Sequence, residues 1–515
     1  MVSCRRALTF ERYSTKKSEV MSSNGSEVQT IAVAGASGFL GRALSETLGS
    51  DYELIGLTRD LARSRELDQG YQWRKADLFS RKQTLDGLEG ADLAIYLAHS
   101  GRPSASLTQG DVRDMELICA DNFARAARRQ GVNEIVHISG IVPDEGEPGH
   151  HLSTRLEVEE TLGVYGAQVT TLRVGMVIGP GGDLTEMLFR LVEKLPVMVL
   201  PRWTQNEIRP ISRSDLMELV QYVLQNPVSR GRSWVVGGPD PVTFEMLLQM
   251  SAELMELRRR IYTVSVTTPR LSSAWISMFT GLPRTMVRPV VEMLRHPTLR
   301  GGKTLQEHAG QTPTALRSAL AHALDHRELP DAKTARNTDS SREMIPIKTR
   351  REVRSVQRLP VPPGRRARWI AETYARWLPR FMAPFMRVEF REERYLDFYA
   401  RLLPWPILSL ELDREVSQPD RQLYWIQGGL LAGTQDRGRL EFRDVLAGQW
   451  SLAAIHRFRP RLPWFIYILT QAQVHLFVMK AFGRYLGRER QRCLESDDRK
   501  SLPGPEPMDD IKSTG

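Results

Sequence analysis

The chain has 515 residues, of which 41% are hydrophobic and 26% are charged. This balance excludes wholesale disorder and a polytopic membrane protein, and the length exceeds what one hydrophobic core supports, so we expect two or three domains. The three cysteines, Cys4, Cys119 and Cys493, lie far apart and match no metal-binding or redox pattern, which favours a cytoplasmic protein without a metal site.

The net charge of +10 is distributed unevenly along the chain. Residues 331–401 contain about 17 Lys and Arg against about 9 Asp and Glu. No zinc-finger, helix-turn-helix or aromatic RNA-binding signature accompanies them, so we expect no nucleic-acid partner. A basic face toward an anionic membrane is the alternative that this charge leaves open.

Residues 1–28 are polar and rich in serine, which excludes a secretory signal peptide and predicts a disordered leader, with Met21 as an alternative start. The pattern then changes. The run "TIAVAG" (30–35) predicts a strand, and "FLGRALSETLG" (39–49) has apolar residues at helical spacing. The glycines of this turn therefore lie between a strand and a helix.

Gly35, Gly38 and Gly41 follow one another at intervals of three in this turn. We expect Gly35 to permit a tight turn, Gly38 to let the backbone approach a pyrophosphate, and Gly41 to allow close packing of the helix on the strand. The amides of the helix N-terminus would bind the phosphates of a dinucleotide.

Strands and helices alternate over the next 150 residues or so. The strands expected after the first one span residues 52–58, 72–77, 91–98, 133–139 and 167–179. Between the fourth and fifth strands, residues 111–131 predict a long amphipathic helix that ends at Gly131. This alternation predicts an α/β fold with a doubly wound parallel sheet.

The end of the second strand bears on the choice of cofactor. An acidic residue there would accept hydrogen bonds from the adenine ribose of NAD, but this chain has Thr58 followed by Arg59. A guanidinium suits a 2′-phosphate, so we expect NADP, while Asp60 beside it leaves NAD open.

These residues resemble the short-chain dehydrogenase/reductase superfamily, in its extended and atypical branches, for which "GASGFLG" (35–41) is a typical opening. The resemblance implies an epimerase-like, NAD(P)-binding Rossmann domain. Besides the three glycines and Arg59, it implies cofactor contacts at Ser37, Phe39 and Leu40 in the turn, at Asp77 and Leu78 near the adenine, and at Ala98 and His99 near the ribose.

The same resemblance predicts a catalytic serine after the fifth strand and a Tyr-x-x-x-Lys pair about a dozen residues later. Ser139 occupies the serine position, but His151 and Arg155 stand where the tyrosine and lysine are expected. A histidine can donate a proton near neutral pH, whereas arginine is always protonated and cannot shuttle protons. We therefore name Ser139, His151 and Arg155 as catalytic candidates, with an exposed loop histidine as the alternative for His151.

The segment "RVGMVIGPGGDL" (173–184) resembles the part that closes over the nicotinamide end in this superfamily. Residues 195–227 and 233–250 follow the order of its small substrate-covering part. The run over residues 29–325 is most similar to uncharacterised bacterial NAD(P)-binding fusion proteins, with "LPVMVLPRW" (195–203) as the most specific shared feature.

Residues 326–350 read as a polar linker, and a second pattern follows them. A strand over 353–361 precedes a helix with the apolar stripe Ile370, Ala371, Tyr374, Trp377 and Leu378. Residues 406–416 and 438–445 then alternate apolar and polar side chains. This alternation predicts an antiparallel sheet with one face in water.

Residues 462–490 predict one long apolar helix. The order of strand, helix, sheet and terminal helix resembles a START-like, helix-grip α+β domain over 351–490, and a disordered tail is expected over 491–515. The resemblance implies a small apolar ligand between the sheet and the last helix. Gln471 and His475 share one helix face, where they line a pocket or pair in the core.

The uncharged run Trp464–Met479 is shorter than the roughly 20 residues needed to cross a bilayer. It is therefore either a buried domain helix or an interfacial one, and with the apolar segment 272–283 it leaves peripheral membrane attachment open.

Together these features predict an NADP-binding oxidoreductase that acts on a bulky or apolar substrate. Two alternatives stay open. The first is a non-catalytic NADP-sensing or assembly protein, because the tyrosine and lysine are missing. The second is a lipid-binding, membrane-peripheral protein whose nucleotide domain is regulatory.

Overall fold

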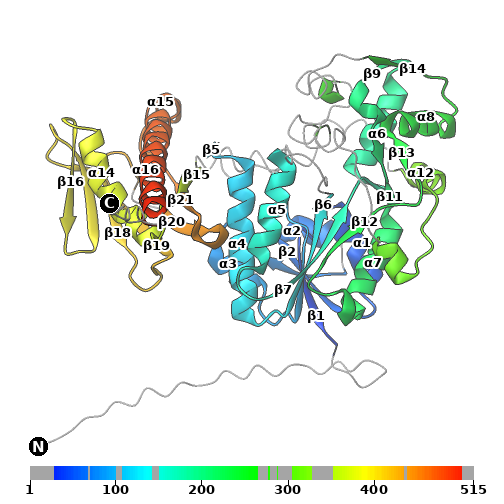
Figure 1. Cartoon of the computed structure of the whole chain (residues 1–515), viewed down its shortest axis with the longest axis horizontal. Helices are drawn as coiled ribbons and strands as arrows, with labels where there is room; N and C mark the ends of the chain where they lie inside the picture. Colours follow the sequence, from blue (N-terminus) through cyan, green and yellow to red (C-terminus); the bar gives the residue numbers. More distant parts are fainter. Residues whose placement is uncertain are drawn as a thin grey trace, which may run out of the picture.

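A computed structural model describes residues 28–67, 70–99, 107–141, 150–264, 276–278, 287, 291, 304–327, 352–433 and 438–501. The predicted leader and most of the predicted linker lie outside these residues. We call residues 28–327 the N-terminal part and residues 352–501 the C-terminal part. Figure 1 shows the two parts side by side, with α3 (Arg81–Gly87) and α4 (Val112–Gln130) between their sheets.

The core of the N-terminal part is a seven-stranded sheet in the order β12-β7-β6-β4-β1-β2-β3. Every neighbouring pair is parallel. In chain order the strands are β1 (Thr30–Ala34), β2 (Glu53–Thr58), β3 (Gln72–Lys75), β4 (Leu93–Tyr96), β6 (Glu134–Gly140), β7 (Gln168–Val174) and β12 (Ser233–Val236). The predicted parallel α/β sheet is confirmed.

Helices cover both faces of this sheet. Alternating residues of its strands point to opposite faces, and they pack with these helices in two separate clusters. Ile31 and Val33 pack against α1 (Phe39–Leu48) and α7 (Arg213–Gln225). Ala32 and Ala34 pack against α4 and α5 (His150–Gly163). The helix α4 begins at the cap Asp111 and ends at Gly131, whose φ is 77°, as the sequence predicts.

One expectation about the small substrate-covering part is wrong. The strand and helix expected there at residues 233–236 and 213–225 are β12, at the edge of the main sheet beside β7, and α7, which packs on the face of that sheet. The reason is tertiary: Leu216, Val220 and Val223 of α7 are buried in the cluster of α1 and β1, which is separate from the cluster of the later helix α8.

A smaller cluster forms the remaining part of this region. It contains α6 (Asp183–Lys194), α8 (Phe244–Leu254) and α12 (Leu316–Asp325), with the strands β9 (Val197–Pro201) and β14 (Arg260–Val264) paired in parallel. The N-terminal part also contains the short elements α2 (Leu61–Leu67), β8 (Val177–Ile178), η1 (Arg202–Gln205), β10 (Glu207–Ile208), β11 (Ile211–Ser212), η2 (Pro227–Ser229), β13 (Val242–Thr243) and α11 (Leu305–Ala309).

The C-terminal part is built on an eight-stranded mixed sheet in the order β16-β17-β18-β19-β20-β21-β15-β5. Its strands are β15 (Val353–Pro360), β16 (Met386–Arg391), β17 (Tyr395–Ala400), β18 (Pro406–Leu412), β19 (Arg421–Gly428), β20 (Arg439–Val445) and β21 (Trp450–Phe458), with η3 (Leu446–Gly448) before β21. The antiparallel pattern predicted for this region is present, and the START-like identification stays a prediction.

The eighth strand comes from the other part of the chain. β5 (Leu107–Gln109) lies between β4 and α4 in the sequence and pairs in parallel with Val353–Ser355 of β15. The side-chain amide of Gln109 also donates to the carbonyl of Ala472 at 3.0 Å. The segment that follows β4 therefore joins the sheet of the C-terminal part directly.

One face of this sheet packs on α14 (Ala367–Phe381) and on α16 (Gln471–Ser501). The expected single terminal helix is two helices, α15 (Trp464–Leu469) and α16, because the backbone of Thr470 leaves the helical region between them (φ −119°, ψ −84°). α16 also continues past residue 490, where a disordered tail was predicted. No proline or glycine interrupts residues 488–501, so nothing local ends the helix there.

The second face of the sheet is not in water at β20, contrary to the prediction from its alternating sequence. Glu441 and Arg443 are 1% and 3% exposed. α4 of the N-terminal part covers them, with Met115, Ile118 and Cys119 packed on Val356 and Leu452. The alternation is real, but its polar residues face another domain rather than solvent.

A buried ion network joins the two parts at this face. Arg443 donates to Glu441 at 2.5 Å, to Asp121 at 2.6 Å and to the Asn122 amide oxygen at 2.6 Å. Arg421 donates to the same Glu441 at 2.6 Å. Burial opposes ionisation of Glu441, but Arg443 and Arg421 outweigh it and hold the pKa of this carboxyl well below its ordinary value.

Further ion pairs join the two parts. Arg125 of α4 lies 3.0 Å from Asp420. Arg358 of β15 lies 2.7 Å from Asp114 and 2.8 Å from Glu157. Buried ion pairs of this kind add little net stability over apolar contacts, but they fix one relative orientation because any other leaves charges unpaired.

Replacing Arg443 by Met should lower the free energy of unfolding by about 3–5 kcal/mol, because Glu441 and Asp121 keep their negative charges in a buried site. Urea denaturation followed by circular dichroism measures this. The matched control is Arg368→Met, which breaks an exposed pair with Glu372 and should cost about 0–1 kcal/mol. Equal losses for the two variants would contradict the role of the buried network.

Candidate functional site

The glycine turn between β1 and α1 has the geometry that the sequence predicts. Gly35 has a φ of 95°, in the left-handed region, and its carbonyl accepts a 3.0 Å hydrogen bond from the amide of Gly38. Gly38 is the N-terminal cap of α1; it contributes no side-chain hydrogen bond, and the first turn has no acidic residue. The first amides of α1 are thus left available to an anion.

Close backbone contacts explain two of the three glycines. A Cβ on Gly35 would lie 3.0 Å from the Cβ of Leu97, just after β4. A Cβ on Gly41 would lie 2.4 Å from the carbonyl oxygen of Ala36, so only glycine allows α1 to begin this close to the turn. Ser37 is exposed at the tip of the turn, and Phe39 and Leu40 are half-buried behind it.

At the end of β2, Arg59 is exposed, while Asp60 is engaged by its own helix. The Asp60 carboxylate accepts the amide of Arg63 at the start of α2, and the Asp60 amide donates to the Thr58 hydroxyl at 3.1 Å. Asp60 therefore acts as a local helix cap, and it is less available as an acceptor for a ribose.

Asp77 and Leu78 follow β3, and both contact residues that are distant in the sequence. The Asp77 carboxylate accepts the amide of Phe79 at 3.2 Å and lies 3.6 Å from the guanidinium of Arg354. The Leu78 carbonyl accepts from the side chain of Asn122 at 2.7 Å. The guanidinium of Arg354 stands 3.8 Å from the centre of the Phe79 ring.

Sequence reasoning missed Arg354, because it comes from β15 in the C-terminal part. Its guanidinium is nearly buried and lies within electrostatic range of both Asp77 and Arg59. Burial lowers the pKa of Arg354, and Asp77 partly offsets this. No local pattern in the sequence pairs a strand of the C-terminal part with the residues predicted to lie near the adenine.

His99 and Arg155 meet at a third residue that was not predicted, Glu116 of α4. The Nδ1 atom of His99 contacts the Glu116 carboxylate, and a guanidinium nitrogen of Arg155 lies 3.9 Å from it. Glu116 is 2% exposed. The sequence contains only a weak indication that Glu116 is buried. If Asp114, Glu116 and Asp121 all faced solvent, they would share one face of the predicted helix, and they do not.

Of the other candidates, Ser139 and Ala98 lie at the carboxyl ends of strands and His151 lies on a helix. Ser139 is the penultimate residue of β6, pairs in register with Arg173 of β7 and is buried. Ala98 follows β4 and is half-buried. His151 belongs to the first turn of α5, but its side chain lies outside the described part of the structure.

The segment expected near the nicotinamide end lies against the start of α1. A Cβ on Gly182 would lie 3.1 Å from the ring of Phe39, and the guanidinium of Arg213 lies 5.6 Å from the centre of that ring. The glycines at 179, 181 and 182 thus allow this loop to approach the turn that begins α1.

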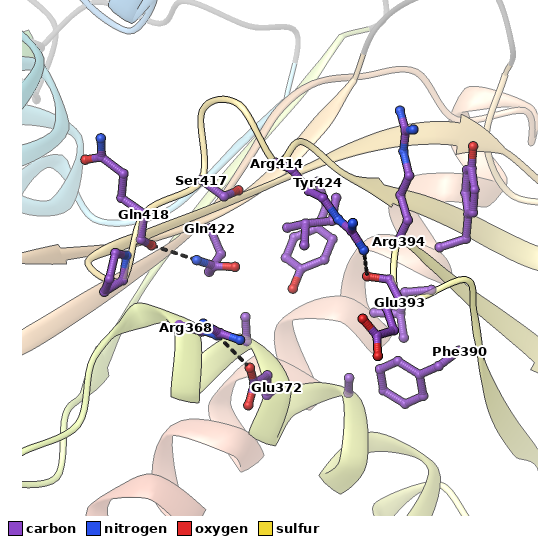
Figure 2. Close-up of a pocket in the computed structure, with 16 residues that line it drawn as sticks. Arg368, Glu372, Phe390, Glu393, Arg394, Arg414, Ser417, Gln418, Gln422 and Tyr424 are labelled. Atoms are coloured by element: carbon purple, nitrogen blue, oxygen red, sulfur yellow. Dashed lines mark hydrogen bonds and ion pairs between the residues drawn. The ribbon is translucent and has the colours of Figure 1, made fainter.

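The C-terminal part contains an open cleft of about 720 Å³ between α14 and the strands β16–β19 (Figure 2). Arg368, Arg394 and Arg414 stand at its rim, and Leu396 and Tyr424 are among its apolar lining residues. The lining belongs to α14 and the sheet, whereas the resemblance implied a cavity beside the last helix.

His475 pairs within the core rather than with this cleft. Its Nε2 lies 3.1 Å from the hydroxyl of Ser355 on β15. Burial lowers the pKa of His475 to about 4, so the ring is neutral near pH 7. The residue therefore helps to join α16 to the sheet.

Comparison with known families supports the family resemblance predicted for the N-terminal part. Residues 31–237 match the sequence profile described as the NAD dependent epimerase/dehydratase family. The auxiliary protein GraX of Staphylococcus aureus (strain NCTC 8325 / PS 47) is 31% identical over 141 residues, which are 27% of this chain and 42% of GraX. The chain thus matches less than half the length of this curated relative.

Solved structures resemble the chain at low sequence identity. A nucleoside-diphosphate-sugar epimerase from Staphylococcus aureus is 17% identical, with a TM-score of 0.45 over 57% of this chain and 100% of that one. An NADPH-dependent quinone oxidoreductase from Escherichia coli, complexed with NADPH, is 19% identical, with a TM-score of 0.46 over 57% and 99%. A Citrobacter triphenylmethane reductase, complexed with NADP(H), is 18% identical, with a TM-score of 0.45 over 57% and 99%.

Gly35→Ala should destabilise the protein by at least about 1 kcal/mol more than Gly90→Ala. Both substitutions place alanine at a positive φ, which costs about 1–2 kcal/mol, but only the one at Gly35 meets a neighbour, since nothing lies within 4 Å of a Cβ on Gly90. Urea unfolding of the two variants checks this, and equal losses would show that the turn tolerates a side chain.

Proposed function

We propose that the N-terminal part, which by its residues 31–237 belongs to the NAD dependent epimerase/dehydratase family, binds NADP, and that the protein is an oxidoreductase acting on a bulky or apolar substrate. The observation that carries the proposal is the uncapped start of α1 behind Gly35, where backbone amides face an open turn. A pyrophosphate placed there gains hydrogen bonds and the positive end of the helix dipole.

Two side chains support NADP over NAD. Arg59 is exposed at the end of β2, where its planar guanidinium can bind a 2′-phosphate in two hydrogen bonds. Asp60, the residue that would favour NAD, already accepts an amide of α2. The negative charge of Asp60 beside Arg59 would oppose the 2′-phosphate of NADP. Because the Asp60 carboxylate already accepts the amide of Arg63, it is less available to bind the ribose of NAD.

The chemistry of the bound nucleotide would be hydride transfer at the nicotinamide ring. For that reaction Ser139 would hold the substrate oxygen by its hydroxyl, as the resemblance implies. Arg155 is set beside Glu116 and His99, so its charge is balanced and its donors suit ribose hydroxyls rather than proton transfer. The proton would then come from His151, the titratable group at the position of the missing tyrosine.

The structure gives one specific reason to keep a second candidate, an NADP-sensing protein without turnover. The segment after β4 continues into β5, which is an edge strand of the C-terminal sheet, and Asp77 lies beside Arg354. Occupancy of the nucleotide site would then bear directly on the contact between the two parts. A ligand of the C-terminal part, in the cleft of Figure 2, stays a prediction in both cases.

NADPH binding is tested by the change in its fluorescence on titration with the full-length protein. Gly38→Asp should weaken binding at least about tenfold, because a carboxylate would stand where the pyrophosphate approaches. Arg59→Glu should weaken NADPH by a similar factor and leave NADH unchanged. The control Arg65→Glu makes the same charge change at an exposed position of α2. No fluorescence change for the wild type would overturn the proposed site.

Catalysis is tested by the oxidation of NADPH with apolar aldehydes, ketones and quinones as acceptors, followed by absorbance. His151→Phe should abolish turnover and leave the affinity for NADPH intact. His150→Phe is the matched control at the neighbouring position and should keep turnover. Retained turnover in His151→Phe would dismiss this histidine as the proton donor, and binding without turnover for any acceptor would favour the sensing candidate.

A further inference from the structure

Several turns of the C-terminal part meet at one end of its sheet. The amide of Arg401 donates to the carbonyl of Phe385 at 2.8 Å, which joins the end of the β17 strand to the turn before β16. Leu430 donates to Pro406 at 3.2 Å, and Arg461 donates to Leu431 at 3.2 Å. The turn between β17 and β18, the loop after β19 and the segment that leads into α15 therefore lie together.

Large apolar side chains project from these segments into solvent. We call them the apolar tip, and they are Phe385, Leu402, Trp405, Phe465, Leu469 and Phe477. Each is between 57% and 96% exposed. The ring of Phe477 lies 5.9 Å from that of Phe381 at the end of α14, so α16 and α14 reach the same end of the sheet. Figure 1 shows α15 at the upper end of this part.

Single exposed apolar residues need no explanation, but large exposed apolar residues on several segments that meet at one end of a sheet mark an interaction site. The core beneath it is closed by other residues, including Phe458, Tyr467 and Phe482, so the tip residues are not core side chains left outside by chance.

The charge around the tip has one sign. Residues 379–388, 400–408, 428–433 and 459–477, which form or flank it, contain no aspartate or glutamate. They contain five arginines: Arg380, Arg387, Arg401, Arg459 and Arg461. Two of these pair with acids outside the tip, Arg387 with Glu389 and Arg459 with Glu352. The partner that fits is therefore apolar at its centre and negative at its rim.

A helix that spans a membrane is one arrangement to consider. Trp464–Glu495 is long and apolar enough to cross a bilayer by length and composition alone, and a third of its most apolar window is buried in the protein. However, Met479, Phe482 and Leu486 pack in the core against α14 and the sheet. Drawing all of α16 into a bilayer would open that core, so only the exposed side of α15, the part of α16 around Phe477 and the neighbouring turns can enter lipid.

We propose that the apolar tip inserts into the interfacial region of an anionic lipid bilayer. Phe and Leu side chains on turns and on a short helix reach the acyl boundary, Trp405 prefers the headgroup level, and the arginines beside them contact lipid phosphates. The proposal is independent of the nucleotide site. It also places the C-terminal part where apolar substrates are dissolved.

Sedimentation of the full-length protein with vesicles tests the proposal. Vesicles of phosphatidylcholine mixed with phosphatidylglycerol should bind the protein more tightly than vesicles of phosphatidylcholine alone, and added salt should reduce this difference. The double variant Leu402→Ser with Trp405→Ser should lower binding to the mixed vesicles at least about tenfold. Arg401→Glu with Arg461→Glu should remove the preference for the anionic lipid.

Val228→Ser is the matched control, because Val228 is 67% exposed on the N-terminal part, far from the tip in the sequence. It should leave vesicle binding unchanged. The tip residues are exposed, so the variants should keep the circular dichroism and urea midpoint of the wild type. A second double variant, Phe465→Ser with Leu469→Ser on α15, asks the same question with residues from another segment.

Three results would overturn the proposal. They are absence of vesicle binding by the wild type, binding that both tip double variants retain in full, and binding that the Val228→Ser control loses equally. Analytical ultracentrifugation covers the remaining occupant, a second copy of the chain. A dimer that dissociates on Leu402→Ser with Trp405→Ser, without vesicle binding, would assign the tip to self-association instead.

Discussion

Helix α4 has no long face in water. Ala120, Phe123 and Ala127 pack on the parallel sheet, while Met115, Ile118 and Cys119 pack on the sheet of the C-terminal part. Between these apolar faces the helix carries Asp121 and Asn122, both buried. Arg443 binds both of them and offsets their desolvation, and Asp121 is also paired with Arg125. The arrangement of the two parts depends on this match of buried charges across one helix.

The same helix links the interface between the two parts to the predicted nucleotide site. Glu116, one turn before Ala120, contacts His99 and lies near Arg155. Asn122 binds the Leu78 carbonyl, beside the residue that Arg354 contacts. Any change in the angle between the two parts would therefore move groups around the predicted ribose and adenine positions. This contact distinguishes the protein from a nucleotide domain that merely carries a tethered second domain.

The two ends of the C-terminal sheet have different surroundings. At one end, the cleft of Figure 2 has charged residues at its mouth and lies between α14 and the sheet. At the other, Leu402, Trp405 and Phe465 are exposed, and the segments that carry them contain arginines but no aspartate or glutamate. The face of the sheet that packs on α4 joins the C-terminal part to the N-terminal part. Each surface of this domain thus has its own chemical character, and each suits a different kind of contact.

The sequence alone determined the features that depend on local geometry. Gly35 and Gly41 predict the turn because a positive φ and a close backbone contact leave no room for a side chain, and both are explained by neighbours within a few residues or by the adjoining strand. The cap residues Asp111 and Gly131 likewise bound α4 correctly. Periodicity identified the central strands β1 and β4 of the parallel sheet, because burial on both faces makes each of them a short apolar run.

Only the tertiary structure decided which polar residues meet. The alternation in β20 indicates two faces but does not say what covers the polar one, and Glu441 and Arg443 proved to face α4. The assignment of α7 and β12 to the main sheet, the break at Thr470, and the meeting of Arg354 with Asp77 share this cause. A pattern along the chain records whether a side chain is apolar, whereas its partner is set by packing between segments that are distant in sequence.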